Sequence, residues 1–277
     1  MIIDFHTHIF PEEICLNREN FFSDSSFRLL YEDRNSTLAS YSQLSQYLQR
    51  AEISGAVAMA FPWGSEYLCK LHNDYMSDVA SRYKNIYPFG ILPREKIRSI
   101  FAMAESIKKS KLYGIGEVAL YEDGLTDNNL KYLHRVFEAA EYFNLPLCIH
   151  LNEPLGHSYR GKYITPFEKI YHLIKNFPKT TVILSHWGGG ILFYELMPEV
   201  KECFKKVYYD TAASPFIYDN AIYSASIKIV GHKKILFGTD FPLLSEKRYL
   251  PPIYETGEEF SSDILGNNCA EILNLKI

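Results

Sequence analysis

The first eight residues, Met1-Ile2-Ile3-Asp4-Phe5-His6-Thr7-His8, join an apolar, β-prone run to two histidines separated by one residue. Alternate residues of a β-strand point to the same face of a sheet. We therefore expect a first strand over residues 2–8, with His6 and His8 projecting together from its C-terminal end. Two imidazoles placed in this way can hold one metal ion, although a His-x-His pair taken alone is a weak signal.

The composition is that of a globular protein. Of the 277 residues, 47% are hydrophobic and 22% are charged, and the net charge is −4. These values allow a large core and favour neither nucleic acid nor an anionic membrane surface as a partner. The five cysteines are scattered and form no Cys-x-x-Cys pair, so we expect neither a disulfide framework nor a four-cysteine zinc site. With no signal-peptide pattern and no apolar run of about 20 residues, we expect a cytoplasmic protein.

Strand-like and helix-like segments alternate along the chain after residue 40. The remaining strands are predicted at residues 56–61, 86–91, 112–118, 146–150, 181–186, 207–211 and 235–239. Helices are predicted at residues 41–53, 67–83, 96–109, 128–143, 165–176, 191–204 (kinked at Pro198), 216–230 and 267–275. Eight short apolar strands separated by amphipathic helices are typical of an α/β fold, and we predict a single-domain (β/α)8 TIM barrel over residues 1–277. An open doubly wound sheet is less favoured because no Gly-x-Gly-x-x-Gly follows a strand.

Residues 9–40 form a polar and aromatic stretch with no steady period of 2 or 3.6. Loops of this length are uncommon in compact domains and usually carry function. We expect an insertion over the mouth of the active site, with room for a short helix.

Polar residues follow several of the predicted strands at their C-terminal ends. They are His6 and His8 on the first strand, Glu117 on the fourth, His150 on the fifth, His186 on the sixth and Asp240 on the eighth. Each residue alone has an ordinary structural explanation, such as a core histidine or a helix cap. A barrel, however, brings all of these strand ends to one mouth. Imidazole and carboxylate ligands suit a divalent metal, zinc above all, and also manganese, iron or cobalt.

These motifs together resemble the amidohydrolase superfamily of metal-dependent barrels. The runs Ser185-His186-Trp187-Gly188-Gly189-Gly190 and Gly238-Thr239-Asp240-Phe241-Pro242 are similar to the subgroup that contains aminocarboxymuconate semialdehyde decarboxylase. The run Gly114-Ile115-Gly116-Glu117-Val118 is instead similar to the deoxyribonuclease-like hydrolases, in which this Glu bridges two metals. Because both signatures occur in one chain, the resemblance leaves the number of metal ions open.

The resemblance implies that His6, His8 and Asp240 hold a buried metal, with His150 as a further ligand. With one metal, His186 is free to orient or deprotonate a water molecule. With two, Glu117 bridges them while His150 and His186 hold the second, and this is the arrangement that we favour. A metal lowers the pKa of bound water from about 15.7 towards 7. Asp240 and His186 are then the expected catalytic residues, Asp240 moving a proton and His186 polarising the substrate.

The loop over residues 151–162 is the predicted substrate-binding segment because it directly follows a strand end. It carries His157, Tyr159, Arg160 and Lys162. Arg160 and Lys162 could bind a carboxylate or phosphate, and Arg94 after the third strand is a further candidate. The alternative is that these residues are charges on a solvent-exposed loop.

The leading functional hypothesis is a metal-dependent hydrolase that cleaves a small amide, lactone or ester bearing an anionic group. The alternatives are non-oxidative decarboxylation of an aromatic or unsaturated acid, and phosphodiester cleavage. A non-catalytic metal-binding barrel ranks last because none of the expected ligands is missing. The expected partner is a small-molecule substrate, with no nucleic acid and no membrane, and a homo-oligomer is left open.

Overall fold

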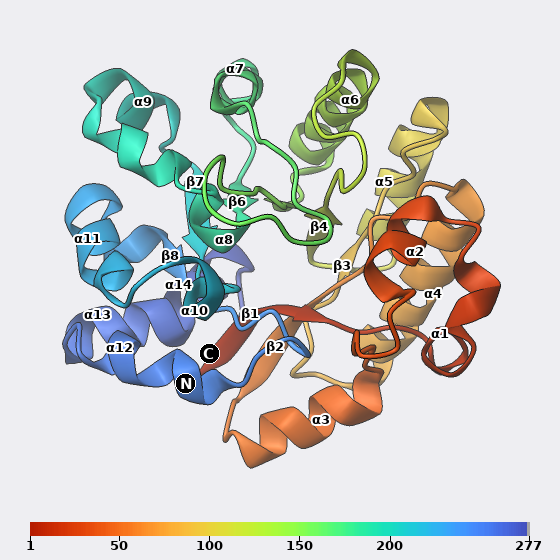
Figure 1. Ribbon diagram of the computed structural model, residues 1–277, viewed down its shortest axis with the longest axis horizontal. Coiled ribbons are helices and arrows are strands. Elements are labelled where there is room, and N and C mark those ends of the chain that lie inside the picture. The colour runs from red at the N-terminus through yellow and green to blue at the C-terminus, as the bar shows by residue number, and fades with distance from the viewer. Residues whose placement is uncertain (276–277) are drawn as a thin grey trace.

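A computed structural model describes residues 1–275, and its centre is a sheet of eight parallel strands (Figure 1). The strands follow chain order around the sheet. They are β1 (Ile3–His8), β2 (Gly55–Met59), β3 (Phe89–Gly90), β4 (Gly114–Val118), β5 (Leu147–Ile149), β6 (Val182–Leu184), β7 (Val207–Asp210) and β8 (Ile235–Leu236). The predicted (β/α)8 barrel is therefore confirmed.

The two ends of the sheet meet through backbone hydrogen bonds between β1 and the segment after β8. The amide of Phe5 donates to the carbonyl of Phe237 over 2.7 Å, and the amide of Asp240 donates to the carbonyl of His6 over 2.9 Å. These bonds join the first and last strands, so the barrel is nearly closed. They also place Asp240 beside the two histidines of β1.

Helices surround the barrel, as Figure 1 shows. They are α1 (Glu12–Leu16), α2 (Ser25–Tyr31), α3 (Tyr41–Arg50), α4 (Glu66–Arg82), α5 (Ile100–Lys109), α6 (Asp127–Phe143), α7 (Phe167–Asn176), α8 (Ser185–Gly188), α9 (Pro198–Cys203), α10 (Ser214–Ile217), α11 (Ala221–Val230), α12 (Leu250–Tyr254), α13 (Glu258–Ser262) and α14 (Asn268–Ile272). Local signals set the ends of α6: the Thr126 side chain accepts from the amide of Asn129, and Asn144 closes the helix in the left-handed conformation. A side-chain cap of this kind contributes about 1 kcal/mol.

Apolar side chains fill the barrel and the layer around it. Ile3, Phe5, Val57, Met59 and other inward residues form the inner cluster, and a second, larger cluster lies between strands and helices. Burying one such side chain contributes roughly 1.5–3 kcal/mol. The rigid barrel is the support on which the polar strand ends are held.

Residues 9–40 contain more helix than we expected. They form α1, a 3₁₀ turn at Arg18–Phe21, and α2. Helices of five and seven residues are too short to show a 3.6-residue period, which explains why the sequence pattern missed them. The segment is held by aromatic packing, in which Phe27 lies 4.9 Å from Trp63 between ring centroids.

Two segments that we predicted as continuous helices are each divided in the structure. The predicted helix over residues 191–204 is a 3₁₀ turn at Ile191–Leu196 followed by α9, which begins at Pro198. Proline suits the first position of a helix and forces the preceding residue into an extended conformation, so it starts a helix here rather than kinking one. The predicted helix over residues 216–230 is likewise divided into α10 and α11.

Candidate metal centre and substrate cavity

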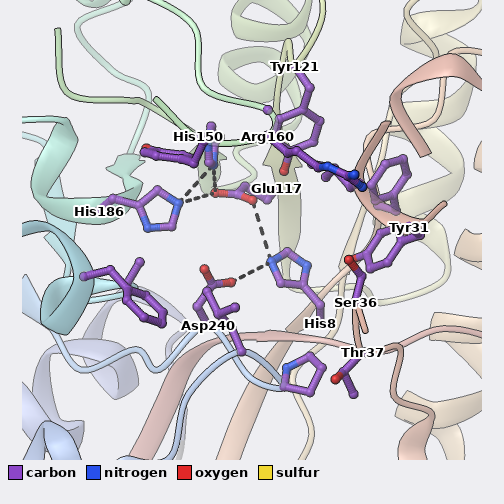
Figure 2. A pocket seen from close by; sticks show the side chains of 18 of the residues that line it. His8, Tyr31, Ser36, Thr37, Glu117, Tyr121, His150, Arg160, His186 and Asp240 are labelled. Atoms are coloured by element: carbon purple, nitrogen blue, oxygen red, sulfur yellow. Dashed lines mark hydrogen bonds and ion pairs between the residues drawn. The ribbon is translucent and has the colours of Figure 1, made fainter. Parts of the chain in front are cut away.

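The six predicted metal ligands come together at the C-terminal mouth of the barrel, where Figure 2 labels all of them except His6. They are His6, His8, Glu117, His150, His186 and Asp240, and their ligand atoms fall into two groups, each spanning no more than 4.8 Å. His6, His8 and Asp240 form one group, and Glu117, His150 and His186 form the other.

In the first group, the Nε2 atoms of His6 and His8 are 3.0 Å apart. The Oδ1 atom of Asp240 lies 3.6 Å from His6 Nε2 and 3.4 Å from His8 Nε2. The pairing of β1 with β2 shifts in register between Asp4 and Thr7. Both histidines of β1 thus present Nε2 to one point, as the sequence predicted.

In the second group, Glu117 contacts both histidines. Its Oε1 atom lies 3.2 Å from His150 Nδ1 and 3.6 Å from His186 Nε2. The same oxygen is 3.7 Å from His6 Nε2, and Oε2 is 3.7 Å from His8 Nε2. Glu117 therefore joins the two groups into one cluster.

His186 is placed by a turn and not by a strand, contrary to our prediction. Strand β6 ends at Leu184, and both His186 and Trp187 have φ near 57° within α8. The ring is held by its Nδ1 atom, which lies 3.1 Å from the carbonyl of Ala212. This contact leaves Nε2 directed at Glu117.

Asp210, at the end of β7, is a candidate site residue that the sequence analysis missed. Its Oδ2 atom is 2.8 Å from His6 Nδ1, and its Oδ1 atom accepts from the backbone amide of His186 over 2.9 Å. A carboxylate on the far nitrogen of a histidine fixes the tautomer and directs Nε2 to the ligand. The signal was present, since Asp210 is another acidic residue at a strand end, but our strand ran one residue further.

The carboxylates and histidines shift one another's pKa values. Although burial disfavours the charged imidazole, Asp210 and Glu117 raise the pKa of His6 to about 10. Burial likewise opposes the charge of His186, but Glu117 raises its pKa to about 9. Burial favours neutral carboxyl groups, yet the histidines hold the pKa of Glu117 well below its usual range and lower that of Asp240 to about 2. The cluster thus stabilises positive charge.

The donor set fits a divalent cation. Within residues 1–275, no lysine or arginine forms an ion pair with Glu117, Asp210 or Asp240. Buried carboxylates need a compensating charge, and here only histidines stand near them. Imidazole nitrogens and carboxylate oxygens are common ligands of zinc and are also suited to manganese.

The chain is matched by the family model described as Amidohydrolase over residues 3–275. The chain belongs to the amidohydrolase family. No curated protein sequence is similar enough to this chain to count as a match.

Three solved structures of other proteins are similar in fold. The 5-carboxyvanillate decarboxylase of Sphingomonas paucimobilis has a TM-score of 0.80 at 17% identity, covering 99% of each chain. The 2,6-dihydroxybenzoate decarboxylase of Rhizobium has a TM-score of 0.72 at 16% identity, covering 99% of this chain and 98% of that one. A dihydroxybenzoic acid decarboxylase of Polaromonas, solved with manganese and 2-nitroresorcinol, has a TM-score of 0.69 at 16% identity, covering 99% and 97%. At these identities the likeness establishes the fold.

The amidohydrolase cluster opens into a cavity of about 650 Å³. Tyr31, Phe61 and Tyr121 line it with aromatic rings, and the rings of Phe61 and Tyr121 stack with centroids 6.2 Å apart. Residues 30–37, from the segment after β1, form one side of the mouth, together with the loop that follows β5.

The predicted substrate-binding residues divide into two sets. His157, Tyr159 and Arg160 line the cavity. Lys162 does not: its Nζ atom donates to Glu153 Oε1 and to two carbonyls of its own loop, each within 3.0 Å. Arg94 is also outside the lining, where it contacts Ser26 Oγ at 3.5 Å. Lys162 therefore ties the loop together and leaves Arg160 to face the cavity.

Asn152 is a second residue that the sequence analysis did not single out. Its Oδ1 atom accepts from the amide of Tyr163, so its Nδ2 group faces His150 Nε2 and the Tyr159 hydroxyl, each at 3.0 Å. Asn152 thus connects the ring of a candidate ligand to the loop above it.

None of the described helices is long and apolar enough to cross a membrane. The cytoplasmic location remains a prediction, and the oligomeric state stays open.

Proposed function

We propose that this amidohydrolase is a divalent-metal-dependent decarboxylase of a small, hydroxylated aromatic acid. The observation that carries the proposal is the aromatic-lined cavity, in which the rings of Tyr31, Phe61 and Tyr121 stand directly beside the histidine and carboxylate cluster. Three proteins of similar fold are decarboxylases named for such acids, and one was solved with manganese. This was our alternative hypothesis from sequence, and it now has more support than hydrolysis.

The reaction needs a proton for the ring carbon and a group that stabilises the negative charge developing on the substrate. The bond between the ring carbon and the carboxylate breaks, its electron pair stays on the ring, a proton is added to that carbon, and carbon dioxide leaves. When bound, a divalent cation would hold an oxygen of the substrate and withdraw charge from it. The ligands that would hold it are His6, His8 and Asp240, with Glu117 and His150 as further donors.

His186 is the candidate proton donor. Its Nε2 atom faces the centre of the cluster, and in the metal-free cluster Glu117 raises its pKa to about 9. Asp240 holds its proton far less strongly, so it would act as a carboxylate. The aromatic walls would hold the substrate ring, and Arg160 at the mouth would attract its negative charge.

The direct test is release of carbon dioxide from a panel of hydroxybenzoates, including 2,6-dihydroxybenzoate and 5-carboxyvanillate, by protein loaded with manganese or zinc. We expect release from at least one acid together with the matching phenol, and its loss in His186→Gln. If no acid is decarboxylated, while the same preparation cleaves amides or lactones, the proposal is wrong and hydrolysis replaces it.

Hydrolysis remains the second candidate because the ligand atoms form two groups bridged by Glu117. Two metal ions held in this way are a common arrangement for hydrolysis. Metal analysis separates the two candidates: a ratio of about two ions per chain that falls to about one in Glu117→Ala would favour the hydrolase. A ratio of about one in both proteins would favour the decarboxylase. Zinc is the metal we predicted, and manganese is the metal of the Polaromonas protein.

A further inference from the structure

A second cavity lies beside the first and shares part of its wall. It has a volume of about 380 Å³. Three residues, His157, Phe216 and Ile217, line both cavities. We refer to this second cavity as the side lobe. None of the six cluster residues lines it, so it can hold only a part of the substrate that does not react.

Two glycines, Gly189 and Gly190, contribute backbone and no side chain to the lining of the side lobe. Gly189 and Gly190 follow the turn that places His186, and both have positive φ, 61° and 97°. A Cβ atom on Gly190 would stand 3.2 Å from the Tyr218 hydroxyl and 3.8 Å from the ring of Phe193, inside the lobe. A Cβ atom on Gly189 would lie 2.4 Å from the carbonyl oxygen of Asn152, so no side chain fits there.

The walls of the side lobe are mainly apolar. Leu155, Phe167, Phe193, Phe216 and Ile217 contribute them. Leu155 and Phe193 are 80% and 41% exposed, and nothing within residues 1–275 covers them further. Exposed apolar side chains gathered at the edge of a cavity are typical of a ligand-binding surface.

Among the described residues that line the side lobe, Glu153 is the only carboxylate, and it is already paired. The Glu153 carboxylate accepts from Lys162 Nζ over 2.7 Å and from the Tyr159 hydroxyl over 3.1 Å. No lysine or arginine is among the described residues that line the side lobe. Among these residues only the imidazole of His157 can carry positive charge, whereas an uncharged hydrocarbon group would bury apolar surface along the rest of the lobe.

From this placement we propose that the substrate carries an uncharged apolar substituent, alkyl or aryl, which extends from the ring into the side lobe. This inference rests on the proposed function for the identity of the ring, and on the shared wall of the two cavities for the direction of the substituent. Phe193 and Leu155 are then specificity-determining residues, since they touch the substituent and not the reacting ring.

The test is a binding series that does not depend on turnover. Resorcinol and resorcinols bearing chains of one to five carbons, at each ring position in turn, are titrated by calorimetry into the metal-loaded protein. We expect affinity to rise about two- to fourfold per methylene at one ring position, in line with the burial of a CH₂ group. Phe193→Asp and, separately, Leu155→Asp should remove this gain while leaving resorcinol affinity unchanged.

Leu196→Asp is the matched control, because Leu196 is exposed in the same 3₁₀ turn as Phe193 and lines neither cavity. It should leave the affinities of the whole series unchanged.

Affinity that is flat or falling with chain length at every position overturns the proposal, as does a gain that survives both aspartate variants. If the gain is found but no acid is decarboxylated, the side lobe is supported and the proposed reaction is wrong. If unsubstituted acids are decarboxylated but the series is flat, the reaction is supported and the side lobe is not.

Discussion

Two groups of buried histidines in this barrel have opposite electrostatic surroundings. His6 and His186 at the strand ends face carboxylates, which raise their pKa values to about 10 and 9 despite burial. His72 on α4 is equally buried, and burial lowers its pKa to about 4. Its Nδ1 atom accepts from the indole of Trp63 over 3.0 Å, and its Nε2 atom donates to the carbonyl of Ile9 over 2.8 Å.

The comparison shows that the hydrogen-bond partners of a buried histidine indicate its role. His72 has a neutral partner on each nitrogen, so it is complete without any ligand and joins α4 to the segment after β1. The strand-end histidines are surrounded by acids that need positive charge, which either protons or a metal ion can supply. Burial alone does not separate a structural histidine from a candidate ligand, whereas its partners do.

Replacing the imidazole of His186 should have the largest effect on activity. In His186→Gln we expect kcat to fall by about 10²–10⁴, the usual contribution of a general acid. The free energy of unfolding should change little, because the backbone contact to Asp210 does not depend on the ring. Steady-state kinetics and thermal unfolding on one preparation check both parts. Unchanged kcat would remove His186 from the mechanism.

His72→Leu should show the reverse pattern. It leaves the Trp63 indole N–H and the Ile9 carbonyl without partners, so we expect a loss of about 2–4 kcal/mol in the free energy of unfolding. Metal content should stay at the wild-type value. His172→Leu is the control, since that histidine is exposed on α7, and its effect should stay within about 0.5 kcal/mol. Loss of metal together with stability in His72→Leu would contradict the separation of the two groups.

Asp210→Asn should weaken the metal site without removing a ligand. An amide cannot accept both from His6 Nδ1 and from the backbone amide of His186 as the carboxylate does. We expect metal affinity to fall by about 10- to 100-fold, as for other residues that orient a ligating histidine. Competition with a chelator of known affinity measures the change. Asp219→Asn, at an exposed site, should leave metal affinity unchanged.

Much of the candidate site could be predicted from sequence because a parallel barrel places all strand ends at one mouth. The alternation of apolar strands and helices predicted the barrel, and His6, His8, Glu117, His150 and Asp240 then met without any knowledge of their geometry. The roles of these residues remain predictions.

The residues that could not be predicted depend on contacts between distant segments. Asp210 contacts the ring of His6, which is 204 positions away, and no local sequence pattern links the two. The roles of Lys162 and Arg160 were also indistinguishable in sequence, because which of two loop cations faces the cavity depends on the fold of the loop. The short helices after β1 were hidden because their contacts are aromatic and nonlocal.

The effects that compare the two histidine groups most directly are those of pH on the metal-free protein. The pKa of His6 in the folded state, about 10, lies above its ordinary value of 6.5. Its contribution to stability is therefore fully present below about pH 6.5 and lost as pH rises through 10. The pKa of His72, about 4, lies below 6.5, so only the unfolded chain takes up that proton between pH 6.5 and 4. Stability therefore falls as pH drops through this window.

Denaturant unfolding across pH 4–10 should show both slopes, the alkaline one reduced in His6→Asn and the acidic one reduced in His72→Leu. Slopes that persist in both variants would mean that other groups set the pH dependence and that the contrast between the two histidine groups is not one of charge.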